Sequence, residues 1–192
     1  MTELFETFDA AGRRLGLVPR HEVHARGLWH RSVHVFLFRS DGTLCIQRRA
    51  PNKDIYPGRW DLTVGEHLQP GEDYAAAAHR GLREELGIAA VELTPLGGER
   101  PFRCDLPERG IADHELQAAF RGVFDGALEP DGVEVAAVRS IGAAELHAWV
   151  ARAPADFTPW FLHELRTRPG LGAFGLEERH RATAADSGRS PS

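Results

Sequence analysis

The chain has 192 residues, which is enough for one domain with its own hydrophobic core. With 42% hydrophobic and 27% charged residues, it has the composition of a globular protein and not of an extended disordered one. The formal net charge of −5 argues against a general nucleic-acid-binding protein, but it is compatible with a local basic pocket for a phosphorylated small molecule.

The number of cysteines and the hydropathy of the chain indicate the cellular compartment in which the protein works. Cys45 and Cys104 are too few for a disulfide framework, and neither belongs to a CxxC pair. No N-terminal stretch resembles a secretory signal, and no apolar run approaches the ~18 residues of a membrane span. We therefore expect a cytoplasmic protein with neither membrane nor nucleic-acid partners. The sequence leaves its oligomeric state open.

The expected elements follow one another irregularly along the chain. Strands over 32–38 and 44–48 flank an Asp-Gly turn and predict a hairpin, and a further strand is expected over 60–64. Asp73 can cap a helix over 74–86 that ends at Gly87. The remaining expectations are strands near 91–98, 115–124 and 133–141 and helices over 143–152 and 158–168. Together they predict a mixed sheet flanked by helices.

The C-terminal end differs in composition from the rest. From about residue 177 the sequence loses apolar residues and gains small polar ones, which is typical of a disordered tail. We therefore expect one domain over 1–176 and a tail over 177–192.

Acidic residues gather at the end of the helix expected over 74–86. Glu84 and Glu85 lie near its C-terminus, where the helix dipole disfavours acids, and Glu72 precedes its other end. Arg80 can pair with Glu84 one turn away. Taken alone, such a run is most often a solvated helix face with one salt bridge. A divalent cation such as Mg²⁺ would also offset this negative charge.

The spacing of these residues resembles the Nudix box. In that box a glycine, five residues, a glutamate and seven residues precede Arg-Glu-apolar-x-Glu-Glu-x-Gly-apolar. The residues that match in register are Glu72, Arg80, Leu82, Glu84, Glu85, Gly87 and Ile88. Two positions depart from it, because Glu66 stands at the box glycine and Gly81 at the first of the three helix glutamates. The resemblance implies a Nudix fold that binds Mg²⁺ or Mn²⁺ through Glu72, Glu84 and Glu85.

A second resemblance covers residues 1–165 and is to type I isopentenyl-diphosphate isomerases and their hydrolase relatives. It implies a metal site whose candidate ligands here are His24, His30, His67, Asp113 and Glu115. It also implies a diphosphate site, for which the candidates are Arg20, Arg49 and Lys53, beside an aromatic wall at Trp160. Arg80 of the box is a further candidate for substrate binding. Imidazoles and carboxylates suit Mn²⁺, Zn²⁺ or Mg²⁺, and Arg and Lys pair with phosphate oxygens. Each of these residues alone could equally be an ordinary surface or packing residue.

The isomerase chemistry does not transfer residue by residue. Gly65 stands where that family has a cysteine, and Cys104 stands where it has a tyrosine. We therefore expect a Nudix hydrolase that cleaves a small-molecule diphosphate, such as a nucleoside diphosphate derivative, with Glu84, Glu85 and Glu115 as catalytic residues. Glu115 is the first choice for a general base, since Gly81 supplies no carboxylate. The alternatives are an isomerase that uses Cys104 and a catalytically weak nucleotide-binding module.

Overall fold

The structure is a computed structural model that describes residues 3–9 and 11–176, so the tail expected over 177–192 lies outside the described residues. An eight-stranded mixed sheet forms its centre, with the main order β10-β4-β3-β9-β7. Strands β3 (His30–Phe38) and β9 (Ile111–Val123) run parallel, whereas their other pairings are antiparallel. The expected mixed sheet is therefore confirmed. Within the described residues, no helix is long and apolar enough to cross a membrane.

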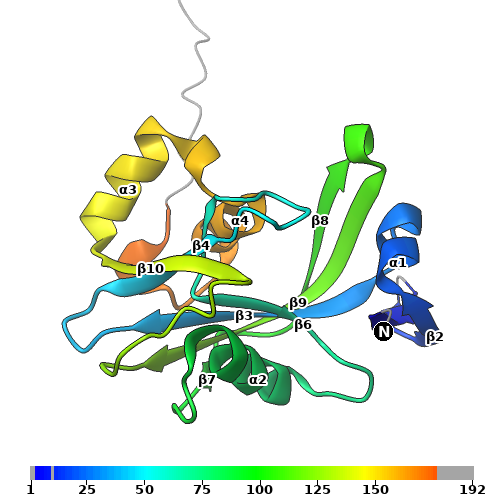
Figure 1. The fold of residues 1–192 in the computed structure, drawn as a ribbon, viewed down its shortest axis with the longest axis horizontal. Coiled ribbons are helices and arrows are strands. Elements are labelled where there is room, and N and C mark those ends of the chain that lie inside the picture. Colours follow the sequence, from blue (N-terminus) through cyan, green and yellow to red (C-terminus); the bar gives the residue numbers. More distant parts are fainter. Residues whose placement is uncertain (1–2, 10, 177–192) are drawn as a thin grey trace, which may run out of the picture.

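Helices cover both faces of this sheet (Figure 1). Helix α2 (Tyr74–Leu86) packs on one face, and α3 (Ala143–Arg152) and α4 (Pro159–Thr167) pack on the other. Two separate clusters of buried apolar residues fill the two interfaces. Almost every residue of β3 is buried, because this central strand has a covered face on each side.

Local sequence explains the helix that carries the box. Asp73 accepts a hydrogen bond from the backbone N–H of Ala76 at 2.8 Å, as expected for an N-cap. Gly87 ends the helix in the left-handed region at φ 69°, where a residue with a side chain would be strained. The predicted bounds, 74–86, are those observed.

The other predictions hold with shifted bounds. The strand expected over 60–64 is two short strands, β5 (Trp60–Asp61) and β6 (Val64–His67), which pair with β4 (Leu44–Arg49) and β3 respectively. In 91–98 only β7 (Thr94–Pro95) forms. Strand β10 (Val135–Ile141) and helices α3 and α4 lie close to where they were expected. Short 3-10 turns span Pro107–Arg109, Pro154–Asp156 and Gly172–Phe174.

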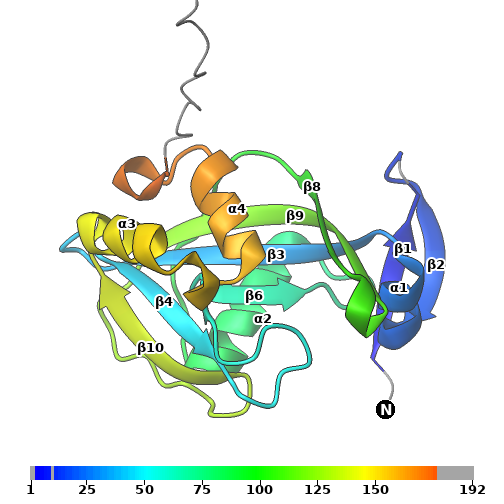
Figure 2. The same cartoon turned by 90° about the horizontal axis from the view of Figure 1, so that it is seen from above.

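Four elements were not anticipated. The N-terminal segment forms a two-stranded sheet of β1 (Leu4–Phe8) and β2 (Arg14–Pro19), followed by the short helix α1 (Arg20–Arg26). Strand β8 (Arg100–Leu106) extends the main sheet beside β9. Figure 2 shows the β1–β2 sheet and α1 together at one end of the main sheet, where β3 begins. This addition contributes Arg20, at the start of α1, to the lining of a pocket.

Candidate functional site

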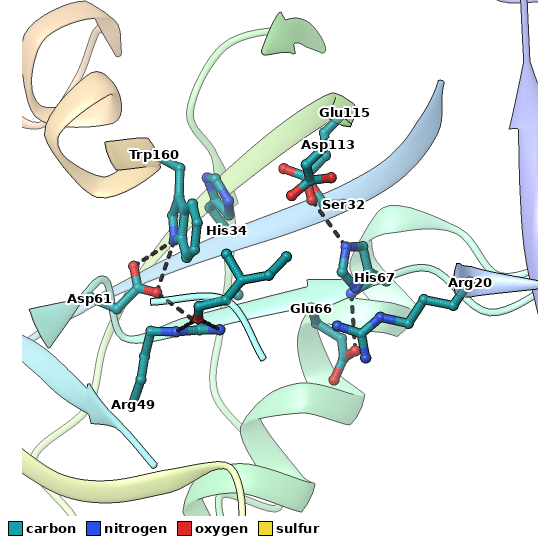
Figure 3. A pocket seen from close by; sticks show the side chains of 12 residues that line it. Arg20, Ser32, His34, Arg49, Asp61, Glu66, His67, Asp113, Glu115 and Trp160 are labelled. Atoms are coloured by element: carbon teal, nitrogen blue, oxygen red, sulfur yellow. Dashed lines mark hydrogen bonds and ion pairs between the residues drawn. The ribbon is translucent and has the colours of Figure 1, made fainter. Parts of the chain in front are cut away.

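A pocket of about 60 Å³ opens where β3, β5, β6 and β9 meet α4 and the start of α1. Such a volume has room for a few water molecules. Its lining is unusually rich in charged residues, and Figure 3 shows Arg49, Asp61 and Trp160 on one side and Arg20, Glu66 and His67 on the other. The remaining lining residues are Ser32, His34, Ile55, Gly65, Asp113 and Glu115.

Four side chains from four elements converge beside the pocket, and two of them, His67 and Asp113, line it. The four are His24 of α1, His30 of β3, His67 of β6 and Asp113 of β9, each of which offers one atom within 4.8 Å of the others. Glu115 adjoins them, with its Oε1 3.1 Å from Nε2 of His67 and 3.9 Å from Nε2 of His30. The strand register explains this meeting, because His30 lies opposite Glu115.

The cluster has unsatisfied polar atoms of the kind that a cation would satisfy. Nε2 of His24, Nε2 of His30 and Oδ1 of Asp113 are buried without a hydrogen-bond partner in the described structure. Leaving such atoms unpaired is costly, and buried polar groups are normally satisfied. Imidazoles with carboxylates form a donor set that suits Mn²⁺ or Zn²⁺ and accepts Mg²⁺. The residues therefore fit a divalent cation.

Two groups of the cluster, His24 and Glu115, are in the protonation state that metal binding needs. Burial lowers the pKa of His24 to about 4, so its imidazole is neutral near pH 7. Burial raises the pKa of Glu115, but the imidazoles of His67, His30 and His34 lower it by more, so that carboxyl group is ionised. Neutral imidazole and ionised carboxylate are the forms that bind metals. For His30, burial lowers the pKa but the Asp113 and Glu115 carboxylates raise it by more, so a cation would have to displace a proton there.

Two of the expected phosphate-binding cations reach the pocket. Arg20 lies 3.6 Å from Asp54, and Arg49 lies 3.5 Å from Asp61 with its guanidinium 5.1 Å from the centre of the Trp160 ring. Lys53 instead pairs with Glu134 and does not line the pocket. The structure thus brings together Arg20, Arg49 and Trp160 but leaves Lys53 outside.

The expected box ligands are placed differently from the histidine cluster. Glu72 accepts hydrogen bonds from Nε and Nη2 of Arg80, at 3.0 and 2.9 Å, and Glu84 is 55% exposed. Glu85 is buried and accepts a hydrogen bond from Gln47 at 3.2 Å. Burial and the nearby Glu66 and Glu134 carboxylates raise the pKa of Glu85 well above its usual value. Among the residues that the structure describes, Glu72, Glu84 and Glu85 do not line the pocket, whereas Glu66 does.

The two departures from the box are neighbours in space. A Cβ placed on Gly81 would lie 2.7 Å from Cγ1 of Val64 and 3.4 Å from Cβ of Glu66. Helix α2 therefore approaches β6 so closely that position 81 has no space for a side chain. The carboxylate of Glu66 lies 3.1 Å from Nη1 of Arg80, which also binds Glu72. A strand carboxylate thus lies where the helix lacks one.

Four polar pocket residues were not predicted from the sequence. His34 and Ser32 follow His30 at even spacing on β3 and so share its face, a signal that alternation alone could have supplied. Glu66 was noted only as a departure from the box. Asp61 gave no signal, because its role depends on Trp160 and Thr158, which are far away in the chain and donate hydrogen bonds to it at 2.8 Å.

Comparison with known proteins identifies a family, related sequences and related folds. The NUDIX domain model matches residues 28–161. The chain is 37% identical to an isopentenyl-diphosphate delta-isomerase of Burkholderia multivorans over 89% of this chain and 95% of that protein. It is 40% identical to a Pseudomonas aeruginosa protein named uncharacterized Nudix hydrolase PA4841, over 72% of this chain and 78% of that one.

Among solved structures, DR0079 from Deinococcus radiodurans superposes with a TM-score of 0.63 at 25% identity, covering 78% of this chain and 90% of that one. A MutT protein from Methanosarcina mazei gives a TM-score of 0.51 at 20% identity and covers 62% of this chain and 81% of that one. The latter likeness concerns the fold alone.

Proposed function

This chain belongs to the Nudix family, and from that membership we propose that it is a divalent-metal-dependent hydrolase of a small-molecule diphosphate. The observation that carries the proposal is the convergence of unpaired histidine and carboxylate atoms beside two pocket arginines. Metal and cationic side chains are what phosphoryl transfer requires, because its transition state places charge on the phosphate oxygens. The cytoplasmic location expected from the sequence stays part of this proposal.

The cation would be held by His24, His30, His67, Asp113 and Glu115. When bound, Mn²⁺ or Mg²⁺ polarises phosphate oxygens and lowers the pKa of an attacking water molecule. The ionised Glu115 lies within hydrogen-bond distance of His67 and would serve as a metal ligand, and its lowered pKa makes it a weak general base.

The diphosphate would be bound by Arg20 and Arg49, which line the pocket beyond the metal ligands. Arg49 is held in place by the carbonyl of Ile55, to which its Nη2 donates at 2.9 Å, and by Asp61. A guanidinium whose position is fixed loses little entropy when it binds phosphate. Arg80 is occupied by Glu66 and Glu72 and would organise the box without contacting the substrate.

The box carboxylates would complete the site only with substrate present. The raised pKa of Glu85 favours its neutral form while no cation lies nearby. Glu84, which is exposed, and Glu85, once ionised, would hold a second cation beside the diphosphate. Glu66, whose carboxylate adjoins Arg80, would take the place of the glutamate that Gly81 lacks.

Isomerisation of isopentenyl diphosphate is the second candidate, and the 37% identity to a protein named for that activity favours it. Isomerisation needs two groups that add and remove protons at carbon. Gly65 has no side chain for this, and Cys104 is buried and lies 3.8 Å from the Tyr56 hydroxyl, outside the pocket lining. Burial raises the pKa of the Cys104 thiol, which further disfavours it as a base.

One assay separates these activities. Isopentenyl diphosphate, ADP-ribose and nucleoside triphosphates are each incubated with the protein and Mn²⁺ or Mg²⁺ in H₂¹⁸O, and products are identified by mass spectrometry and NMR. We expect ¹⁸O in a phosphate group of a cleavage product from at least one substrate, and no dimethylallyl diphosphate. Dimethylallyl diphosphate without phosphate release would establish the isomerase. Tight diphosphate binding without any turnover would establish a binding module.

A further inference from the structure

A buried imidazole at the floor of the pocket is left unused by the proposed metal site. His34 lies in the middle of β3, is 3% exposed and lines the pocket. It is four residues beyond His30 and therefore shares its face of the strand. In Figure 3 it lies between Trp160 and the Asp113–Glu115 pair.

One edge of the His34 ring is fixed by a buried ion pair. Nδ1 of His34 lies 3.0 Å from Oε1 of Glu164, and Nε and Nη2 of Arg168 donate to the same carboxylate at 2.6 and 2.7 Å. Burial raises the pKa of Glu164, but Arg168 and His34 lower it to about 2, so the carboxylate is ionised. An ionised carboxylate only accepts hydrogen bonds, so the proton of a neutral His34 ring is on Nδ1.

The opposite edge of the ring faces the opening at Gly65. His34 lies opposite Gly65 in the β3–β6 pairing, and a Cβ on Gly65 would be 3.8 Å from Cδ2 of His34, the carbon bonded to Nε2. That Cβ would meet only Leu62 and His34, both at ordinary contact distance, so a side chain would fit there. The glycine therefore leaves the Nε2 edge open to the pocket. No residue in the described part of the chain hydrogen-bonds Nε2.

The other candidate bases that line the pocket are engaged elsewhere. His67 and Asp113 belong to the proposed metal site, and Glu66 pairs with Arg80. Asp61 accepts hydrogen bonds from Thr158, Trp160 and the backbone N–H of Leu62. Glu115 accepts hydrogen bonds from His67 and Gln117. Among the described residues that line the pocket, His34 therefore combines a fixed tautomer with an open nitrogen.

We propose, on the basis of the hydrolase function above, that His34 is a catalytic residue whose Nε2 accepts the proton of the attacking water. The O–H bond of that water breaks, its oxygen bonds to phosphorus, and the bridging P–O bond breaks with its electron pair on the departing phosphate. The imidazolium then returns its proton to that phosphate. Glu164, itself held by Arg168, is a positioning residue that fixes the ring and stabilises the imidazolium, as a carboxylate does in a catalytic triad.

The surroundings of His34 support a basic nitrogen. Burial lowers its pKa, but Glu164 raises it by more, so the net pKa lies above the usual 6.5. The other titratable and charged groups that face or adjoin the ring are Glu115, Asp61, His163 and Arg168.

The test compares His34→Gln with His163→Gln, a control at the neighbouring half-buried histidine outside the pocket lining. The substrate is whichever of ADP-ribose, isopentenyl diphosphate or a nucleoside triphosphate the natural protein hydrolyses with Mn²⁺. We expect kcat of His34→Gln to fall at least about 100-fold, with KM and Mn²⁺ affinity within about threefold, because proton transfer contributes about 10²–10⁴-fold. Added imidazole should restore part of kcat in His34→Ala and change neither the natural protein nor His163→Gln.

A second variant keeps the proposal testable if changes at His34 disturb folding. Gly65→Val leaves the His34–Glu164–Arg168 set intact but covers the Nε2 edge, so kcat should fall while thermal stability and Mn²⁺ binding persist. Unchanged kcat in His34→Gln or Gly65→Val, or an equal loss in His163→Gln, would overturn the role of His34 and leave the hydrolase intact. Absence of hydrolysis by the natural protein would overturn both.

Discussion

Two carboxylate-rich regions adjoin the same pocket and are built in opposite ways. In the histidine cluster, buried nitrogens of His24 and His30 and an oxygen of Asp113 have no hydrogen-bond partner among residues 3–9 and 11–176. In the box, Glu72 is bonded twice by Arg80, and Glu85 is bonded by Gln47. The first region is incomplete without a cation, whereas the second satisfies most of its polar groups from within the protein.

This difference predicts an order of binding. Because the ligand atoms of the cluster are already close together and unpaired, binding a metal ion costs little reorganisation. The cluster should therefore bind its cation without substrate. In the box, a cation must first displace protein hydrogen bonds and favour ionisation of Glu85. We therefore expect the box to bind a cation only together with a diphosphate.

The largest expected effect comes from breaking the cluster. His67→Gln should lower Mn²⁺ affinity and kcat by more than about 100-fold, since even residues that merely orient metal ligands contribute about 10- to 100-fold. Calorimetric Mn²⁺ titration and steady-state kinetics measure the two quantities. As a control, His21→Gln changes an exposed histidine on α1, the helix that carries His24, and should leave the Mn²⁺ affinity and kcat unchanged. An intact Mn²⁺ affinity in His67→Gln would contradict the ligand assignment.

Glu85→Gln should separate the two regions. Activity should fall about 100-fold, as for loss of a strong electrostatic contributor, while substrate-free Mn²⁺ affinity at the cluster stays the same. The exposed Glu92→Gln serves as the control. Loss of substrate-free Mn²⁺ binding in Glu85→Gln would show that the regions form one site.

Glu85→Gln should also change how the free energy of unfolding depends on pH. The folded protein raises the pKa of Glu85 above its usual 4.5, so the metal-free protein loses stability as pH rises from about 4.5 through that raised value. Gln cannot ionise, so Glu85→Gln should lack this loss and be more stable than the natural protein at neutral pH. Urea unfolding in the presence of a chelator, compared between pH 4.5 and 7.5, measures the difference. Parallel pH curves for the two proteins would contradict a buried, neutral Glu85.

A smaller effect is expected where the box departs from its pattern. Gly81→Ala should destabilise the protein by about 1–3 kcal/mol, because the added Cβ meets Val64 at 2.7 Å. Helix propensity favours alanine by about 1 kcal/mol but does not offset this clash. Val64→Ala should relieve it in the double variant. Urea unfolding checks both, and a stabilised Gly81→Ala single variant would show that the close approach is relaxed at no cost.

The smallest effect concerns the helix cap. Asp73→Ala removes the acceptor for the Ala76 N–H and should cost about 1 kcal/mol in unfolding free energy, while Asp73→Asn keeps an acceptor and costs less. Neither should alter Mn²⁺ affinity, because the cap stabilises the box helix and not the cluster. A change in that affinity would couple the two regions.

Features that depend on residues close together in the chain could be predicted from the sequence. Asp73 and Gly87 act within a few residues, so the bounds of α2 were predicted as observed. The order of His24, His30, His67, Asp113 and Glu115 led to the cluster through a family resemblance, and not through geometry.

Features that depend on distant contacts were missed. The β1–β2 sheet has little alternation that would mark it, and the fit of Glu66 against Gly81 depends on how closely α2 approaches β6. The His34–Glu164 pair joins residues 130 positions apart, so no local pattern indicates it.

The central claim is that the cluster binds a cation before any substrate arrives. Anomalous diffraction from crystals of the substrate-free protein grown with Mn²⁺ tests it most directly. We expect one strong manganese peak among His24, His30, His67, Asp113 and Glu115, and none beside Glu84 and Glu85. A peak at the box glutamates with none at the histidines would contradict it.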